Sequence, residues 1–256
     1  GLGGYYHRRL VQSCRFLVVP GQKVLELGCA TGDLLAALRP SVGVGLDFSE
    51  EMIRRARERH PDLTFVNLDA HELDGLEGPF DVIILSDLVD DLWDVQAVFR
   101  GLDRLSTPKS RIIINCYSRL WEPVLLTAQK LRLSKPRLSQ NWLTREDVLN
   151  LLNLSDFEPI RTWEEVLLPL GIPLLAPLFN KFLVKLWPFK LLAMSNFIVA
   201  RPKPKDKAQK EQPIVSVIVP ARNEAGNIAQ IFSRTPAMGG GTELVFVEGH
   251  SKDDTY

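Results

Sequence analysis

The sequence has few cysteines, no surplus of either charge and no hydrophobic run long enough to cross a bilayer. Cys14, Cys29 and Cys116 are the only three cysteines among 256 residues, and they are too widely spaced for a disulfide framework or a zinc site. We therefore expect no metal and a reducing, cytoplasmic compartment. Thirty-one Lys and Arg balance 31 Asp and Glu. Proteins that bind nucleic-acid phosphates usually carry a basic surplus, so no nucleic-acid partner is expected.

The most apolar stretch, Val166–Asn180, has 15 residues without a charge, fewer than the ~20 that span a bilayer. Its three prolines also interrupt a helix, so no transmembrane span is expected. The chain starts without Met and without the apolar core of a secretory signal, which suggests a fragment of a longer protein. Over residues 166–192, lysines alternate with leucines and aromatic side chains. This segment could contact a membrane face or a lipid-linked acceptor, or it could be a packing insertion.

One charged, proline-rich stretch divides the chain. Residues 201–213 contain three prolines and no large apolar side chain, which is typical of an exposed linker. The sequence therefore predicts a first domain over residues 1–200, a linker over 201–213 and a short second segment over 214–256.

Short apolar runs alternate with helical patterns in the first domain. Five runs are predicted to be strands, and they cover residues 23–27, 43–47, 63–68, 80–85 and 111–116. Helices are expected after Ser49 and Thr144, which suit the N-cap position, and over residues 95–105. This alternation predicts an α/β fold with a mostly parallel sheet and helices on both faces. Residues 160–166 and 194–200 are expected to close the sheet as an edge pair.

A turn with two glycines follows the first predicted strand, in the stretch VLELGCATGD over residues 24–33. Glycines let a ligand approach the backbone closely, and the following helix offers free N–H groups. Asp47 ends the second predicted strand and Asp69 follows the third. In parallel sheets ligands bind at these strand ends, where a carboxylate can accept hydrogen bonds from a ribose. Three successive strand ends therefore predict a nucleoside site.

Two ligands compete for this site. A nicotinamide dinucleotide would imply an oxidoreductase and requires the fingerprint G-x-G-x-x-G, but Ala30 and Asp33 occupy the second and third glycine positions. Asp33 would repel a pyrophosphate, and Glu26 adds negative charge. S-adenosylmethionine, which carries a sulfonium and an ammonium group, suits such a pocket better.

The same stretches resemble the successive motifs of class I S-adenosylmethionine-dependent methyltransferases. They are VLELGCATG from residue 24, GVGLD from residue 43, FVNLDA from residue 65 and FDVIILSD from residue 80. The resemblance implies a Rossmann-like, seven-stranded, mostly parallel sheet whose final hairpin is reversed. It also implies that the cofactor-binding residues are Glu26, Gly28, Ala30, Gly32, Asp47, Phe48, Met52, Asp69, Ala70 and Ser86. The family often has Gly where Ala30 stands; a negative φ would make Ala tolerable there, whereas a positive φ would weaken cofactor binding.

The acceptor side of the site is less defined. Methyl transfer mainly needs alignment of donor and acceptor, and a base is required only if the acceptor loses a proton. The weak candidates for a catalytic group are His7, His71 and Tyr117. The candidate substrate-binding residues are Tyr6, Arg119, Trp121, Asn141 and Trp142, although the tryptophans could instead be packing anchors. Four acids, Asp87, Asp90, Asp91 and Asp94, crowd the loop after the fourth predicted strand. Some of them could face the active site, although capping and solvation are the default interpretation.

Residues 214–256 resemble the first βαβ unit of a family 2 glycosyltransferase. The resemblance rests on IVSVIVP from residue 214, the loop ARNEAGN from residue 221, ELVFV from residue 243, and Asp253. Glu248 stands where many members have Asp. The resemblance implies a bacterial protein that fuses a methyltransferase to a glycosyltransferase. The glycosyltransferase part is incomplete in this chain, so we expect it to be unable to transfer sugar. The methyl acceptor would then be an oxygen of a glycan or glycolipid intermediate at the cytoplasmic face. A non-catalytic docking module for the glycosyltransferase is a further alternative.

Overall fold

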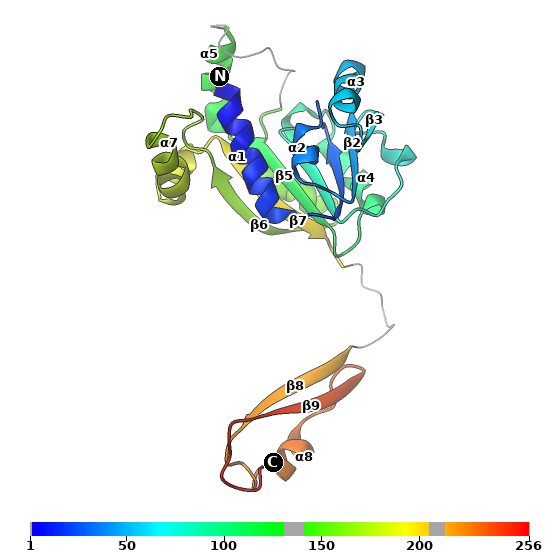
Figure 1. Ribbon diagram of the computed structural model, residues 1–256, viewed down its shortest axis with the longest axis vertical. Coiled ribbons are helices and arrows are strands. Elements are labelled where there is room, and N and C mark those ends of the chain that lie inside the picture. Colours follow the sequence, from blue (N-terminus) through cyan, green and yellow to red (C-terminus); the bar gives the residue numbers. More distant parts are fainter. Residues whose placement is uncertain (1, 131–140, 205–212, 256) are drawn as a thin grey trace. The chain divides into compact units, whose positions relative to one another are not determined.

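The computed structural model describes residues 2–130, 141–204 and 213–255 (Figure 1). The chain divides into two compact units, Gly1–Lys203 and Pro204–Tyr256. Most of the predicted linker, residues 205–212, lies outside the described residues. The first unit continues three residues beyond the predicted boundary at 200, because Arg201 and Pro202 pair with Glu158 and Phe157 across an antiparallel ladder.

A seven-stranded sheet organises the first unit. Its order is β3-β2-β1-β4-β5-β7-β6, and only β7 is antiparallel to its neighbours, which confirms the predicted mostly parallel sheet with a reversed final pair. The strands are β1 (Lys23–Leu27), β2 (Val42–Asp47), β3 (Thr64–Asn67), β4 (Val82–Ser86), β5 (Arg111–Tyr117), β6 (Phe157–Glu165) and β7 (Ser195–Pro202). The strand order reverses direction between β1 and β4, the point at which parallel sheets bind ligands.

Helices cover both faces of this sheet. One buried cluster contains Leu25 and Leu27 with side chains of α4 (Val95–Leu102) and α6 (Arg145–Leu154). The other contains Val24 with side chains of α1 (Leu2–Leu17), α2 (Asp33–Ala37) and α3 (Glu50–Arg59). Alternate residues of β1 therefore enter different cores, as the period of a strand requires, and both faces of the strand are buried.

The helix ends follow the predicted capping chemistry. Ser49 Oγ accepts a hydrogen bond from the Met52 amide at the start of α3, and Thr144 forms a reciprocal capping box with Asp147 at the start of α6. The α-helix predicted over 95–105 ends at Leu102 and continues as one 3-10 turn. Among the described residues, the remaining α-helices of the first unit are α5 (Glu122–Lys130) and α7 (Leu175–Pro177). Short π and 3-10 turns follow α7 over Leu178–Leu192.

The second unit is a single parallel βαβ motif. Strands β8 (Ile214–Ala221) and β9 (Gly241–Glu248) pair in parallel over their whole length, and α8 (Ile228–Arg234) connects them. Phe232 on α8 contacts Phe246 on β9, with ring centroids 5.5 Å apart. In the described part of the chain no helix is long and apolar enough to cross a membrane.

Candidate active site

Two adjoining hollows lie at the carboxyl ends of β1, β2 and β4. Their volumes are about 410 and 600 Å³. The residues that line both are Gly28, Ala30, Ser86, Asp87 and Asp91. Because these shared residues come from the loops after β1 and β4, the two hollows form one cleft across the point where the strand order reverses. The smaller hollow is called the β2 hollow below, and the larger the α1 hollow.

Asp47 is the fixed anchor of the β2 hollow. Its Oδ1 accepts a hydrogen bond from the Ser49 amide and its Oδ2 accepts one from the Ala30 amide, both at 2.9 Å. These bonds tie the end of β2 to the loop after β1. An ionised carboxylate that accepts N–H donors makes charge-assisted bonds, so the loop and the acid hold one another in place at the mouth of the cleft.

Ala30 has a φ of +46°. The sequence led us to expect that Ala is tolerable at this position only if its φ is negative, and the observed φ is positive. A left-handed backbone crowds the Cβ atom and is unfavourable for residues other than Gly, Asn and Asp. The Asp47 bond to the Ala30 amide therefore holds a strained residue in the loop after β1.

An aromatic wall closes the β2 hollow. His71 Nδ1 lies 2.6 Å from Asp69 Oδ1, and the His71 ring stacks on Trp93 with centroids 4.3 Å apart. The His71 backbone amide also donates to Asp69 Oδ1 at 2.8 Å and is the main cause of the lowered pKa of that carboxyl. Trp93 is 76% exposed, so the wall offers a flat apolar surface beside a carboxylate.

Glu26 is a buried acid beneath the α1 hollow. It is 3% exposed, and its Oε2 accepts one hydrogen bond from the Leu35 amide at 3.0 Å. Burial raises the pKa of Glu26 from 4.5 to about 8, because the charged form loses its hydration. A cation near this carboxyl would reverse that effect and favour the ionised form.

Asp87 gathers three polar side chains where the two hollows meet. Its Oδ1 accepts from Tyr6 Oη and from Asn115 Nδ2, each at 2.6 Å, and Tyr117 Oη lies 3.3 Å from Oδ2. The Tyr6 and Tyr117 rings are stacked. Burial, and then the charge on Asp87, raise the pKa of Tyr6 well above its usual value, so this hydroxyl stays protonated and donates. Helix α1 thereby attaches to the loop after β4.

Carboxylates dominate the charge of the cleft. Six acids line the two hollows: Glu26, Asp33, Asp47, Asp69, Asp87 and Asp91. Among the described residues that line the hollows there is no Lys or Arg. A pyrophosphate would meet no counter-charge here, which argues against the nicotinamide dinucleotide alternative. A ligand with a sulfonium and an ammonium group fits this donor set.

Most of the predicted residues meet in this cleft. All the predicted cofactor residues except Gly32 line one or both hollows, as do His7, His71 and Tyr117. Gly32 (φ +74°) is needed for a different reason: a Cβ there would lie 2.5 Å from the Phe65 ring. It permits close packing of the loop on β3.

The predicted substrate-binding residues do not form one wall. Tyr6 donates to Asp87, as described above. Arg119 lines a separate hollow of about 540 Å³, formed by the segment after β5, the start of α6 and residues of β6 and β7. Trp121 and Trp142 pack against the buried cluster on the α1 side, and Trp121 Nε1 donates to the Leu192 carbonyl. Asn141 binds the carbonyls of Asp90 and Leu92.

Trp93 and Asp87 line the cleft but were not singled out from the sequence. Trp93 was missed because a large exposed aromatic in an acidic loop gives no periodic signal. Asp87 was assigned by default to capping or solvation, although its position directly after β4, next to Ser86, could have indicated the site. Its contact with Tyr6 joins residues 81 positions apart in the sequence, and no local pattern predicts such a pair.

Comparisons with known proteins agree with this geometry. A family profile described as "Methyltransferase domain" matches residues 19–154. Demethylmenaquinone methyltransferase of Beutenbergia cavernae is 32% identical over 108 residues, covering 41% of this chain and 45% of that protein. The chain thus spans about half the length of the curated relatives it matches.

Solved structures show the same fold. Magnesium protoporphyrin IX methyltransferase of Synechocystis PCC 6803, solved with bound S-adenosylhomocysteine, aligns with a TM-score of 0.54 at 20% identity, covering 77% of this chain and 84% of that one. An S-adenosylmethionine-dependent methyltransferase of Mesorhizobium loti aligns with a TM-score of 0.56 at 21% identity, covering 78% and 100%. With more than half of its residues matched by the family profile, the chain belongs to the methyltransferase-domain family, whose class I fold and S-adenosylmethionine cofactor the motifs predicted.

Proposed function

We propose that this domain transfers a methyl group from S-adenosylmethionine to a hydroxyl oxygen of a glycan or glycolipid intermediate. The observation that carries the donor half of the proposal is the cleft lined by six acidic side chains, with no Lys or Arg among the described residues that line it. S-adenosylmethionine would supply a methyl group already activated by the sulfonium. Asp47 would hold the ribose, Asp69 and the Trp93 wall would meet the adenine, and Glu26 would face the methionine end.

The acceptor half rests on the Asp87 cluster. Tyr6 and Asn115 donate to the same oxygen of Asp87, which fixes the carboxylate where the two hollows meet. A carboxylate at this place can orient an approaching hydroxyl and take up its proton. Because the Tyr6 hydroxyl stays protonated, it serves as a donor to Asp87 and not as the base. His7 also lines the α1 hollow and would lie beside the same acceptor.

The glycan acceptor is inferred from the second unit, which we propose is the start of a glycosyltransferase. Its parallel βαβ motif brings the loop after β8 against the loop after β9. Asn223 Oδ1 accepts from the Lys252 amide at 2.8 Å, and Asp253 Oδ2 accepts from the Ala225 amide at 3.2 Å. Joined loops of this kind at paired strand ends are suited to a nucleotide.

A carbon acceptor of the quinone type is a second candidate. It is favoured by the relatives, which include a demethylmenaquinone methyltransferase that matches 41% of this chain. A carbon acceptor would place an aromatic ring in the α1 hollow, beside the stacked rings of Tyr6 and Tyr117. The two candidates predict different products and can be separated directly.

The test combines calorimetry with methyl transfer. We expect binding of S-adenosylmethionine and S-adenosylhomocysteine but not of NAD, and incorporation of labelled methyl into a cell-envelope extract. Asp87→Asn should lower incorporation at least tenfold with little change in cofactor affinity, whereas Asp62→Asn, an exposed acid outside the cleft, should change neither. Mass spectrometry of the product distinguishes a methoxy group on a sugar from a methylated quinone ring. Cofactor binding without any methyl transfer would favour the docking-module alternative, and tight NAD binding alone would overturn the proposal.

A further inference from the structure

The segment that follows β6 turns its small side chains inward and its large apolar side chains outward. Ala176, Asn180 and Val184 recur at intervals of four residues, and each is 2% exposed. Leu174 and Trp187 in the same segment are 88% and 77% exposed. A packing insertion would show the opposite arrangement, because large apolar side chains gain most from burial.

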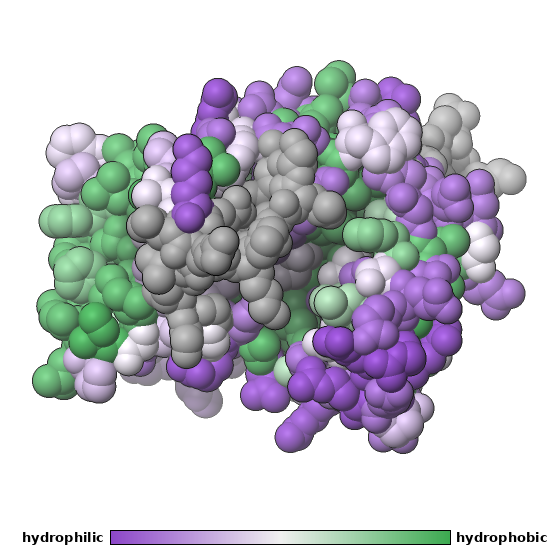
Figure 2. All heavy atoms as spheres, turned by 90° about the horizontal axis from the view of Figure 1, so that it is seen from above, coloured by the Kyte–Doolittle hydropathy of each residue, from purple (hydrophilic) through white to green (hydrophobic). Residues whose placement is uncertain are grey.

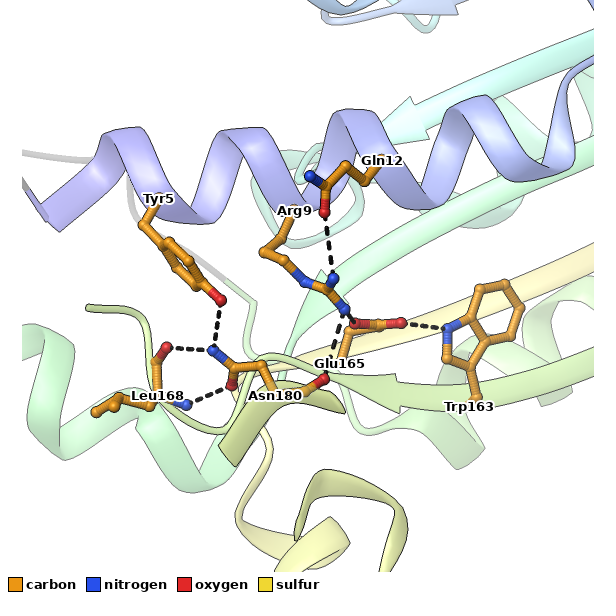
Figure 3. A network of polar contacts seen from close by, with 7 residues as sticks. All are labelled: Tyr5, Arg9, Gln12, Trp163, Glu165, Leu168 and Asn180. Atoms are coloured by element: carbon orange, nitrogen blue, oxygen red, sulfur yellow. Dashed lines mark hydrogen bonds and ion pairs between the residues drawn. The ribbon is translucent and has the colours of Figure 1, made fainter. Parts of the chain in front are cut away.

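A polar network fixes the inward side of this segment (Figure 3). Asn180 Oδ1 accepts from the Leu168 amide at 2.8 Å, and its Nδ2 donates to the Leu168 carbonyl at 2.7 Å and to Tyr5 Oη at 3.1 Å. Arg9 bridges from α1 to Glu165 Oε2 at 2.7 Å. A buried and fully bonded Asn specifies one orientation, since any other leaves polar atoms unpaired. The outward orientation of the apolar side chains is therefore built into the fold.

These side chains form one exposed apolar surface over α7 and the turns that follow it. We call it the α7 surface; it comprises Leu174, Phe182, Leu186, Trp187, Leu191 and Leu192. Figure 2 shows hydrophobic side chains gathered at the left of the first unit, where Figure 1 places α7. A continuous exposed apolar surface of this kind usually marks an interaction site.

The charges within the surface have one sign. Residues 166–192 contain Lys181, Lys185 and Lys190 and no Asp or Glu. In the described part of the chain none of these lysines forms an ion pair. Lys185 and Lys190 also line a neighbouring hollow of about 570 Å³, together with Arg161. The two acids of that hollow are already paired, Glu165 with Arg9 and Glu164 with Arg145.

We propose that the α7 surface docks this domain onto an anionic lipid bilayer. Leucine, phenylalanine and tryptophan side chains would enter the region between headgroups and acyl chains, and the lysines would pair with lipid phosphates. A second copy of the chain fits less well, because a two-fold contact would bring the same three lysines together. The inference does not depend on the identity of the methyl acceptor.

The experiment measures flotation of the 256-residue chain with vesicles of phosphatidylcholine, with and without phosphatidylglycerol. We expect binding only to the anionic vesicles, and weaker binding as salt rises, because salt screens the lysines. K181Q/K185Q/K190Q should weaken binding roughly 100-fold at low salt, since each lysine near a surface contributes about fivefold. L174S/W187S should abolish it, while V42S/L154S, a matched pair of exposed apolar positions outside the surface, should not.

Each further outcome decides the question. Binding that survives both the lysine and the apolar variants overturns the proposal, as does equal loss in V42S/L154S. Loss of binding in I218S/V247S alone would assign the bilayer contact to the second unit instead. Self-association on a sizing column without vesicle binding would make the surface a contact between copies. If L174S/W187S fails to fold, as judged by circular dichroism, the lysine variant and the salt series decide.

Discussion

Strands β1 and β8 hold similar places in their units and have different surroundings. Both are rich in apolar residues, and both begin a βαβ motif. β1 has parallel neighbours on both sides and helices over both faces, and only Lys23 of its five residues is exposed. Among the described residues β8 pairs in a sheet with β9 alone. Its residues alternate between exposed and half-buried up to Ala221, which is buried. The difference teaches that apolar residues predict a strand, whereas its burial depends on how many other elements pack around it.

The largest effect is expected when a buried side chain of β1 and a half-buried side chain of β8 are each truncated to Ala, which tests the difference in burial between the two strands. Leu27 on β1 is fully buried, so Leu27→Ala should lower the free energy of unfolding by about 2–5 kcal/mol through lost burial and a cavity. Val217 on β8 is only half-buried, and Val217→Ala should cost its unit about 1 kcal/mol or less.

The tryptophans allow the two units to be followed separately. All five lie in the first unit, between residues 93 and 187, so fluorescence during urea unfolding reports that unit alone. Hydrogen exchange at the β8 and β9 amides reports the second. Leu154→Ala, at an exposed position on α6, is the control and should change little. Equal effects at Leu27 and Val217 would mean that β8 is buried by something the two-stranded motif does not provide.

Glu26 provides a second contrast, because β1 buries an acid and β8 has none. The pKa of Glu26 rises from 4.5 to about 8 on folding, so between these pH values the folded state holds a proton that the unfolded state has lost. Stability therefore falls as pH rises through this window and is flat above it. The expected loss is on the order of 3 kcal/mol from pH 5 to pH 8, at 1.36 kcal/mol per unit.

Glu26→Gln removes this dependence and keeps an oxygen that accepts from the Leu35 amide. The variant should be more stable than the natural protein at pH 8 and similar at pH 5, as measured by urea unfolding at each pH. It should also weaken binding of S-adenosylmethionine, whose positive charge favours ionised Glu26. A wild-type stability that rises between pH 5 and pH 8 relative to Glu26→Gln would contradict the assigned pKa.

The fold was largely predictable because its determinants are local. Continuous apolar runs set the strands, and Ser49 and Thr144 set helix starts through bonds within three residues. The site was predictable where a motif residue ends a strand, as Asp47 ends β2. It was not predictable where a contact joins distant segments: Tyr6 with Asp87, or Asn180 with Tyr5. The backbone strain at Ala30 also depends on its bond to Asp47 and leaves no sign in composition.

Asp47→Ala tests the cofactor loop and should weaken S-adenosylmethionine binding by about 1–3 kcal/mol, as loss of a charged hydrogen-bonding partner does. Removing the carboxylate also releases the Ala30 and Ser49 amides. Calorimetry measures the affinity, and Asp253→Ala in the second unit is the control, because it removes a loop carboxylate that does not line the cleft. Unchanged affinity in a folded Asp47→Ala protein would place the cofactor elsewhere.

The smallest expected effect compares the two loops that follow β1 and β8. Each holds a residue other than glycine at positive φ, Ala30 at +46° and Asn223 at +57°. Asn tolerates the left-handed region better than Ala, and Asn223 Oδ1 also accepts from the Lys252 amide. Ala30→Gly should therefore stabilise the first unit by roughly 0.5–1 kcal/mol, because the relief of strain exceeds the added freedom of glycine in the unfolded chain.

Asn223→Gly should instead destabilise the second unit slightly, because it loses the Asn223–Lys252 bond. Tryptophan fluorescence during urea unfolding measures the first change, and hydrogen exchange in the second unit measures the second. The same two variants examined with S-adenosylmethionine show whether the strain is used in binding. If Ala30→Gly gains stability and loses affinity for S-adenosylmethionine, the left-handed Ala holds the loop ready for the cofactor. If stability and affinity both improve, Ala in place of Gly at this position lowers both.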